Sequence, residues 1–161
     1  MINVDHEDAA LRTFILFIQT IREVLKYTDA HLYRKMHLST TKLIALQALI
    51  NNGGHMMPSK IAQWTQTERH NITTLTERMK KEGLITAERD TTNRRNVNIV
   101  LTDQGREILN RAMPVAIEVV DQVMSSITES DIAQLEKTLR TLRQNAGRGL
   151  QRLAEPGPRS S

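Results

Sequence analysis

The sequence of 161 residues contains no cysteine, and this absence removes several kinds of chemistry at once. Disulfide bridges, thiolate metal sites, iron–sulfur clusters and cysteine nucleophiles all require a thiol. A chain without cysteine fits a reducing compartment, so we expect a cytoplasmic protein. No apolar run approaches the ~18–20 residues that a membrane span needs, and residues 1–6 are acidic and lack the pattern of a signal peptide.

Aromatic residues and enzyme motifs are also scarce. Phenylalanine, tyrosine and tryptophan make up 3% of the chain, which is few for a protein that stacks single-stranded bases. None of the five histidines lies four residues from another, and there is no HExxH zinc motif, P-loop, GxGxxG or GxSxG sequence. We therefore expect no metal, no cofactor, no catalytic residue and no enzymatic activity.

Prolines occur only at positions 58, 114, 156 and 158, which leaves long stretches free to form helices. Helical spacing of apolar residues predicts a first helix over about residues 5–35 and a second from Ser39 or Thr40 to Asn51. A short helix is expected from Pro58. Its expected apolar side consists of Ile61, Ala62 and Trp64.

A further helix is predicted from a Thr67 cap to about Glu82, with Gly83 ending it. Two strands follow at 84–89 and 96–101, and the polar segment 90–95 between them has the length of a hairpin loop.

Two more helices are predicted after this hairpin. Thr102 caps the first, which Pro114 is expected to interrupt or kink. The pair Thr128 and Asp131 resembles a capping arrangement for the second. The apolar stripe of this last helix is Ile132, Leu135, Leu139 and Leu142.

This order predicts a mainly α fold with a small β-hairpin wing, a winged helix-turn-helix flanked by N- and C-terminal dimerisation helices. The expected divisions are an N-terminal helix at 1–37, a winged helix-turn-helix at 38–102, C-terminal helices at 103–146 and a flexible tail at 147–161. The apolar stripes of the flanking helices exceed what a small winged domain can cover, so we expect a homodimer rather than an intramolecular bundle.

The middle block predicts a double-stranded DNA interface, because one helix fits the major groove and a cationic wing tip reaches the minor groove or backbone. Between Pro58 and Arg95 there are eight cationic and five anionic residues, which is +3 of the chain's net +4. On the helix that ends near Glu82, we expect Ile72, Leu75, Thr76 and Met79 to face the domain. The candidate DNA-binding residues are Arg69, His70, Asn71, Thr73, Thr74 and Arg78 on the helix, and Arg89, Asp90, Asn93, Arg94 and Arg95 on the wing.

The same residues carry a resemblance to a known family. The region 38–110 resembles the multiple antibiotic resistance regulator (MarR) family, although the wing has Asn93 where that family usually has Asp. The matching positions are Ile61–Ala62, Thr73, Met79, Gly83–Leu84, Arg89–Asp90, Arg94–Arg95, and Leu101–Thr102 with Gly105. The resemblance implies a dimer with interleaved chain ends and a small, often aromatic or anionic effector bound between the dimer helices and the winged domain.

Two functions from different classes remain open. The first is a dimeric, sequence-specific transcription regulator, a repressor on a pseudo-palindromic operator whose DNA affinity a small ligand changes. The second is an architectural or protein-interaction module whose charged face docks a protein or binds DNA without sequence choice. Taken singly, the helix face could be merely solvated and the wing arginines could only aid solubility. The simultaneous presence of the turn, the helix and the cationic wing favours the first.

Overall fold

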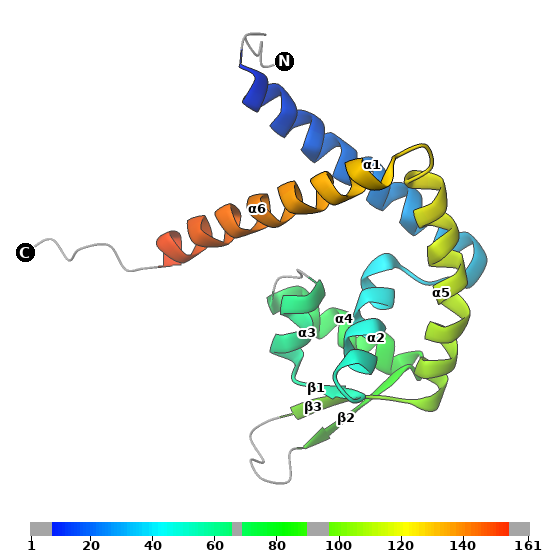
Figure 1. The fold of residues 1–161 in the computed structure, drawn as a ribbon. Coiled ribbons are helices and arrows are strands. Elements are labelled where there is room, and N and C mark those ends of the chain that lie inside the picture. The colour runs from blue at the N-terminus through cyan, green and yellow to red at the C-terminus, as the bar shows by residue number, and fades with distance from the viewer. Residues whose placement is uncertain (1–7, 66–68, 90–96, 155–161) are drawn as a thin grey trace, which may run out of the picture. The chain divides into compact units, whose positions relative to one another are not determined.

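The computed structural model describes residues 8–65, 69–89 and 97–154 (Figure 1). One compact unit ends at Val123 and a second begins at Met124. The helices and strands are α1 (Ala9–Met36), α2 (Thr40–Asn51), β1 (His55–Met56), α3 (Pro58–Thr65), α4 (Arg69–Lys81), β2 (Ile85–Arg89), β3 (Val97–Leu101), α5 (Asp103–Val123) and α6 (Glu129–Ala154).

Side-chain caps set the starts of the first two helices. The Asp8 carboxylate accepts from the backbone N–H groups of Ala10 (2.8 Å) and Leu11 (3.2 Å), so α1 begins at Ala9 rather than near residue 5. Ser39 caps α2 by accepting from the N–H of Lys42 at 3.3 Å, as the sequence predicts. Helices α1 and α2 therefore begin where a short polar side chain satisfies unpaired backbone donors.

The core of the first unit is built around α2, whose residues Leu43, Ala45, Leu46, Ala48 and Leu49 are buried. The other large, fully buried side chains come from the elements that surround this helix: Leu32 of α1, Ile61 of α3, Met79 of α4 and Ile85 of β2. In Figure 1, α2, α3 and α4 cluster above the small sheet, and α5 runs along one side of them. The winged helix-turn-helix expected from the sequence is confirmed.

The sheet has three strands in the order β1-β3-β2, whereas the sequence predicted only two. The predicted hairpin is present, with Ile85 opposite Leu101 and Arg89 opposite Val97. Strand β1 adds to the other edge of β3, pairing Met56 with Ile99. A two-residue strand has no alternation to detect, so only the distant partner strand reveals it.

Helix α5 begins at the predicted cap, because the Thr102 hydroxyl accepts from the N–H of Gly105 at 3.0 Å. The prediction that Pro114 interrupts this helix is wrong, since α5 continues to Val123. Buried side chains on both sides of the proline, including Leu109 and Val119, anchor the helix and offset the lost hydrogen bond.

Helix α6 forms the second unit and starts at the predicted cap. The Thr128 hydroxyl accepts from the N–H of Asp131 (3.2 Å) and donates to its carboxylate (2.6 Å). The sequence predicted a tail from Gly147, but α6 continues to Ala154. Two helical glycines cost about 1 kcal/mol each, and the alanine, leucine, glutamine and arginine residues around them favour the helix.

No residue of α6 is buried within the chain, although the helix is strongly amphipathic. Within the described ranges, no helix is long and apolar enough to cross a bilayer.

Candidate nucleic-acid interface

Helix α4 buries one face and presents the other to solvent, as its sequence predicts. Ile72, Thr76 and Met79 are buried and Leu75 is half-buried. The Thr76 hydroxyl donates to the carbonyl oxygens of Ile72 (2.9 Å) and Thr73 (3.0 Å), so this buried hydroxyl is paired. The exposed face carries Asn71, Thr73, Thr74, Glu77 and Arg78.

The carboxyl-terminal end of α4 is held by a glycine in the left-handed region. Gly83 has φ +72°, and its N–H donates to the carbonyl of Lys80 at 3.0 Å. The N–H of Leu84 donates to the carbonyl of Met79 at 2.9 Å, which completes a Schellman motif. Only glycine adopts this φ without strain, which explains why the helix ends where the sequence predicted.

An ion pair ties the same end of α4 to α2. The Lys42 ammonium donates to both carboxylate oxygens of Glu82, at 2.6 and 2.7 Å. The Lys42 side chain is only 14% exposed, whereas Glu82 is 46% exposed, so solvent screens the pair from one side only. Sequence reasoning missed this contact, since the two residues lie 40 positions apart.

The start of α5 also holds the carboxyl-terminal end of α4 in place. The Thr102 hydroxyl donates to the carbonyl of Gly83 at 2.7 Å, and the Gln104 amide donates to the carbonyl of Glu82 at 3.1 Å. Gly105 packs so closely that an added Cβ would lie 2.1 Å from the Leu84 carbonyl oxygen. Helix α4 is thus positioned by contacts with both α2 and α5, and its exposed face keeps a defined direction.

The wing rises from β2 and β3, next to α4. Arg89 is exposed at the end of β2, opposite Val97. The remaining wing candidates (Asp90, Asn93, Arg94 and Arg95) lie outside the described residues, as does the predicted Thr67 cap. Arg69 and His70 form the first positions of α4, but their side chains are also outside what the structure describes.

The described candidates therefore divide into two groups. Asn71, Thr73, Thr74 and Arg78 share the exposed face of α4, and Arg89 stands at the base of the wing. Lys80 and Lys81 follow Arg78 in the last turn and are also exposed. This surface combines hydroxyl, amide and guanidinium donors, which suit base edges and phosphates.

A second polar cluster joins α1 to α5 and was missed by sequence reasoning. His31 lies 3.2 Å from the Glu118 carboxylate, and the Lys35 ammonium donates to the same oxygen. Tyr27 donates to Gln122 one turn further along α5. The hydrogen bonds from Lys35 and then from His31 hold the pKa of Glu118 below its usual value.

The sequence does contain one indication of this cluster, which is the spacing of its residues along each helix. Tyr27, His31 and Lys35 are four residues apart along α1, as are Glu118 and Gln122 along α5, so each set occupies one helix face. That the two faces meet depends on tertiary packing. Among the described residues, no group of three or more histidine or acidic side chains is arranged to hold a metal ion.

Comparison with known proteins places this geometry among transcriptional regulators. The transcriptional repressor MprA of Escherichia coli K12 is 26% identical over 106 residues, which is 65% of this chain and 60% of MprA. The chain thus matches less than two thirds of the length of that relative. No family model matches the chain.

Solved structures match over a greater length. The organohalide-sensing regulator RdhR-CbdbA1625, with 2,4-dichlorophenol bound, has TM-score 0.78 and 26% identity, covering 90% of this chain and 88% of its own. Sco3205, a MarR-family transcriptional regulator from Streptomyces coelicolor in complex with DNA, has TM-score 0.79 and 19% identity. The alignment with Sco3205 covers 89% of this chain and 92% of Sco3205. The chain therefore has the fold of MarR-family transcriptional regulators.

The structure explains one residue of the motif on which the family resemblance rests. Gly105, the last residue of the Leu-Thr-x-x-Gly sequence, is where α5 passes against the Leu84 carbonyl. One packing prediction is wrong, because Trp64 is 50% exposed rather than packed on the apolar side of α3. Helix α3 is short, and Ile61 alone fills its buried position.

Proposed function

We propose that this chain is a dimeric, sequence-specific DNA-binding transcription regulator of MarR type that acts as a repressor and whose DNA affinity a small ligand changes. The observation that carries the proposal is the rigid presentation of α4. Its buried face and its clamped end leave Asn71, Thr73, Thr74 and Arg78 exposed together. A recognition helix needs this combination, since base readout requires a fixed direction.

The proposed contacts follow from side-chain chemistry. Asn71 suits adenine, the hydroxyls of Thr73 and Thr74 suit base edges or phosphate, and Arg78 suits guanine or phosphate. Arg69 and His70 stand at the start of α4, where backbone N–H groups also favour phosphate. The wing residues Arg89, Asp90, Asn93, Arg94 and Arg95 are proposed to contact the minor groove or backbone. Sco3205, a relative in fold, is known in complex with DNA, which supports this assignment.

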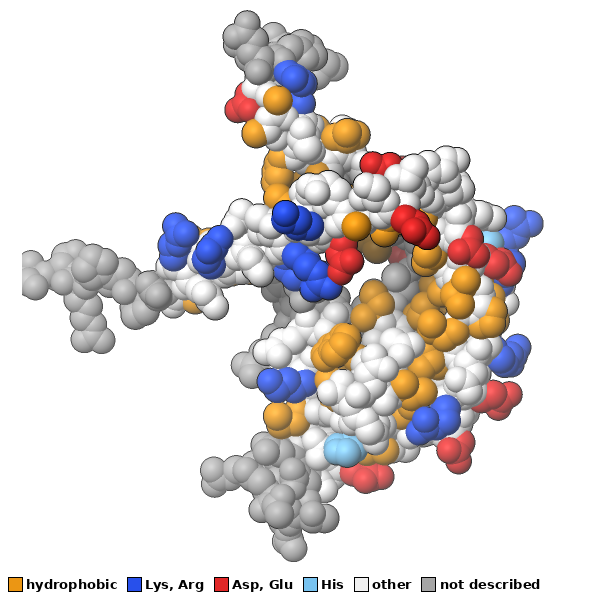
Figure 2. Space-filling view, in the orientation of Figure 1, with side chains coloured by type: hydrophobic (Ala, Val, Ile, Leu, Met, Phe, Trp, Pro, Cys, Tyr) orange, Lys and Arg blue, Asp and Glu red, His pale blue; other side chains and the backbone are white. Residues whose placement is uncertain are grey.

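The dimer is supported by apolar surface that the described chain leaves exposed. Along α1, Phe14 is 58% exposed, Leu16 62% and Leu25 47%, and Figure 2 shows hydrophobic side chains on the N-terminal half of this helix. Scattered apolar residues on a surface are ordinary, but a continuous apolar helix surface marks an interface. A two-fold dimer presents two copies of α4 to half-sites about one helical turn (~10 bp) apart.

Ligand control is supported by one relative. RdhR-CbdbA1625 is an organohalide sensor with 2,4-dichlorophenol bound. For the present chain we propose a small effector of unspecified identity that prefers one spacing of the two α4 helices and so changes DNA affinity. The repressor role rests on the similarity to MprA, and the cytoplasmic location expected from the sequence stays a prediction.

The experiment is a selection from a randomised duplex pool, followed by salt titration of the winning duplex against a scrambled one. We expect a pseudo-palindrome with a specificity ratio of about 10³ or more. Equal, steeply salt-dependent binding of every duplex would instead support the architectural module. Transcription in vitro from a promoter that contains the selected site then separates repression from activation.

A further inference from the structure

Glu77 lies near the middle of the outward-facing side of α4. The residues of α4 that face the core are Ile72, Leu75, Thr76 and Met79. At about 100° per residue, the direction opposite to these four falls between Thr74 and Glu77, about 30° from each. Both of these side chains are exposed. The face that the proposed function places against DNA therefore has a carboxylate near its centre.

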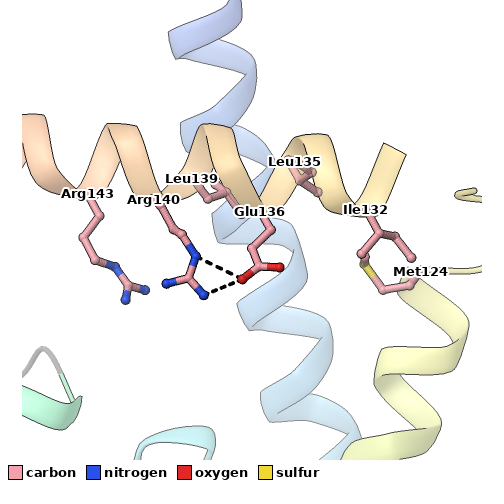
Figure 3. Close-up of a pocket in the computed structure, with 7 residues that line it drawn as sticks. All are labelled: Met124, Ile132, Leu135, Glu136, Leu139, Arg140 and Arg143. Atoms are coloured by element: carbon pink, nitrogen blue, oxygen red, sulfur yellow. Dashed lines mark hydrogen bonds and ion pairs between the residues drawn. The ribbon is translucent and has the colours of Figure 1, made fainter. Parts of the chain in front are cut away.

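The Glu77 carboxylate makes no ion pair with any residue that the structure describes. Lys81 lies four residues further along the helix, which is the spacing at which a glutamate and a lysine pair on a helix surface. Glu136 and Arg140 of α6 have the same spacing and do pair, with Nε of Arg140 donating at 3.0 Å (Figure 3). The acceptor oxygens of Glu77 are thus open to a partner outside the described chain.

A carboxylate on a DNA-facing helix has few partners in the major groove. An ionised carboxylate only accepts hydrogen bonds, and guanine and thymine present only acceptors to this groove. The two donors are the amino groups of adenine and cytosine. The adenine amino group lies between two acceptors, its own N7 and O4 of the paired thymine, whereas the cytosine amino group has an acceptor on one side only. A carboxylate therefore meets less repulsion at cytosine than at adenine.

The negative charge of Glu77 also acts on sequences that lack the matching base. A carboxylate close to DNA repels the phosphates of every duplex, which lowers affinity without regard to sequence. A cytosine amino group at one position returns a charge-assisted hydrogen bond. General repulsion combined with one attractive contact separates the matching duplex from all others more widely than the attraction alone.

We propose that Glu77 is a specificity-determining residue whose carboxylate accepts a hydrogen bond from N4 of one cytosine in each half-site of the operator. This inference rests on the proposed function, because it requires α4 to lie in a major groove. It adds the base that one residue selects. Replacing that cytosine is expected to lower affinity about tenfold per half-site.

Glu77→Gln tests this assignment, because glutamine has the same length but different hydrogen bonding. Its amide both donates and accepts, which matches N6 and N7 of adenine. In the duplex selection, we expect the parent to enrich one cytosine in each half-site and Glu77→Gln to enrich adenine at the same position. Four symmetric duplexes that differ only at this position then give the affinities. The parent should bind the cytosine duplex at least about tenfold more tightly than the others, and the variant should prefer the adenine duplex.

Two further variants separate base readout from a simple loss of charge. Glu77→Asp keeps the charge and shortens the side chain by one methylene, so we expect it to lose the cytosine preference while binding a scrambled duplex like the parent. Glu107→Gln removes the same charge from an exposed position on α5, and we expect it to keep the cytosine preference. Thermal unfolding of each variant checks that its fold is intact, as expected for substitutions at exposed positions.

The outcomes distinguish the role of Glu77 from the function on which it rests. A parent that selects a pseudo-palindrome, with Glu77→Gln selecting the same bases, would overturn the role of Glu77 and leave the regulator standing. An equal gain in affinity by Glu77→Gln on all four duplexes would show that the carboxylate only repels phosphates, and would overturn it as well. A parent chain without any sequence preference would overturn both.

Discussion

Replacing Gly105 with alanine tests the packing that holds α4 against α5. The new Cβ would lie 2.1 Å from the Leu84 carbonyl oxygen and 2.8 Å from Cδ1 of Leu101. The carbonyl has little freedom to move, because it accepts from the N–H of Thr102 at 3.2 Å while the N–H of Leu84 donates to Met79 at 2.9 Å. The clash is relieved only if the start of α5 moves away from the end of α4.

The expected loss of unfolding free energy follows from the packing and the hydrogen bonds that this movement disturbs. Overpacking costs about 1–3 kcal/mol, and the two hydrogen bonds that Thr102 makes to Leu84 and Gly83 are worth about 1 kcal/mol each. Alanine is favoured over glycine in a helix by about 1 kcal/mol, which leaves a net loss of about 2–4 kcal/mol. For a chain of this size, this loss lowers Tm by about 4–16 °C.

Urea unfolding followed by far-ultraviolet circular dichroism, at one fixed protein concentration, measures this loss of unfolding free energy. Gly147→Ala is the matched control, because it is the same substitution in a helix with nothing within 4 Å of the added Cβ. We expect Gly147→Ala to be neutral or stabilising by up to about 1 kcal/mol. An unfolding midpoint for Gly105→Ala at or above that of the parent would refute the close approach of α5 to Leu84.

Three further predictions concern charge and DNA. The pKa of Glu118 is lowered in the folded chain, so its stabilising effect is present above the usual carboxyl pKa of 4.5 and is lost as pH falls further. The difference in Tm between the parent and Glu118→Gln should therefore shrink as the pH falls below this value, and a constant difference would contradict the assignment. Thr74→Ala should change base preference in the duplex selection while leaving the salt slope unchanged, whereas Thr13→Ala should change neither. Arg94→Ala should weaken operator binding without dissociating the dimer, and unchanged affinity at matched salt would remove the wing from the mechanism.

Local signals explain why the buried face and the end of α4 could be predicted from the sequence. The buried face of α4 follows from helical spacing, and its end at Gly83 follows from the φ that the residue adopts. The caps at Ser39, Thr102 and Thr128 were identified for the same reason. In each case a few neighbouring residues determine the outcome, so tertiary packing does not override the prediction.

Two features that the sequence did not predict depend on distant partners. Strand β1 exists because Met56 meets Ile99, and the contact of His31 with Glu118 joins residues 87 positions apart. Two further misses have local causes that the spacing of apolar residues does not reveal: Trp64 stands on a short helix with few buried positions, and α6 passes Gly147 because its neighbours favour a helix. The pairing of β1 and the contact of His31 with Glu118 are not encoded within a single turn of chain.

Because Trp64 is half exposed, its fluorescence responds to changes in its surroundings in the unmodified chain. It is the only tryptophan, it is half exposed, and it stands one residue before the end of α3, close in sequence to the start of α4. All tryptophan emission therefore comes from this point near the end of α3. Changes in its emission wavelength, or in its quenching by acrylamide, follow events at the helix-turn-helix without an attached dye. Titrations with duplexes and with candidate effectors can thus be read from the unmodified protein.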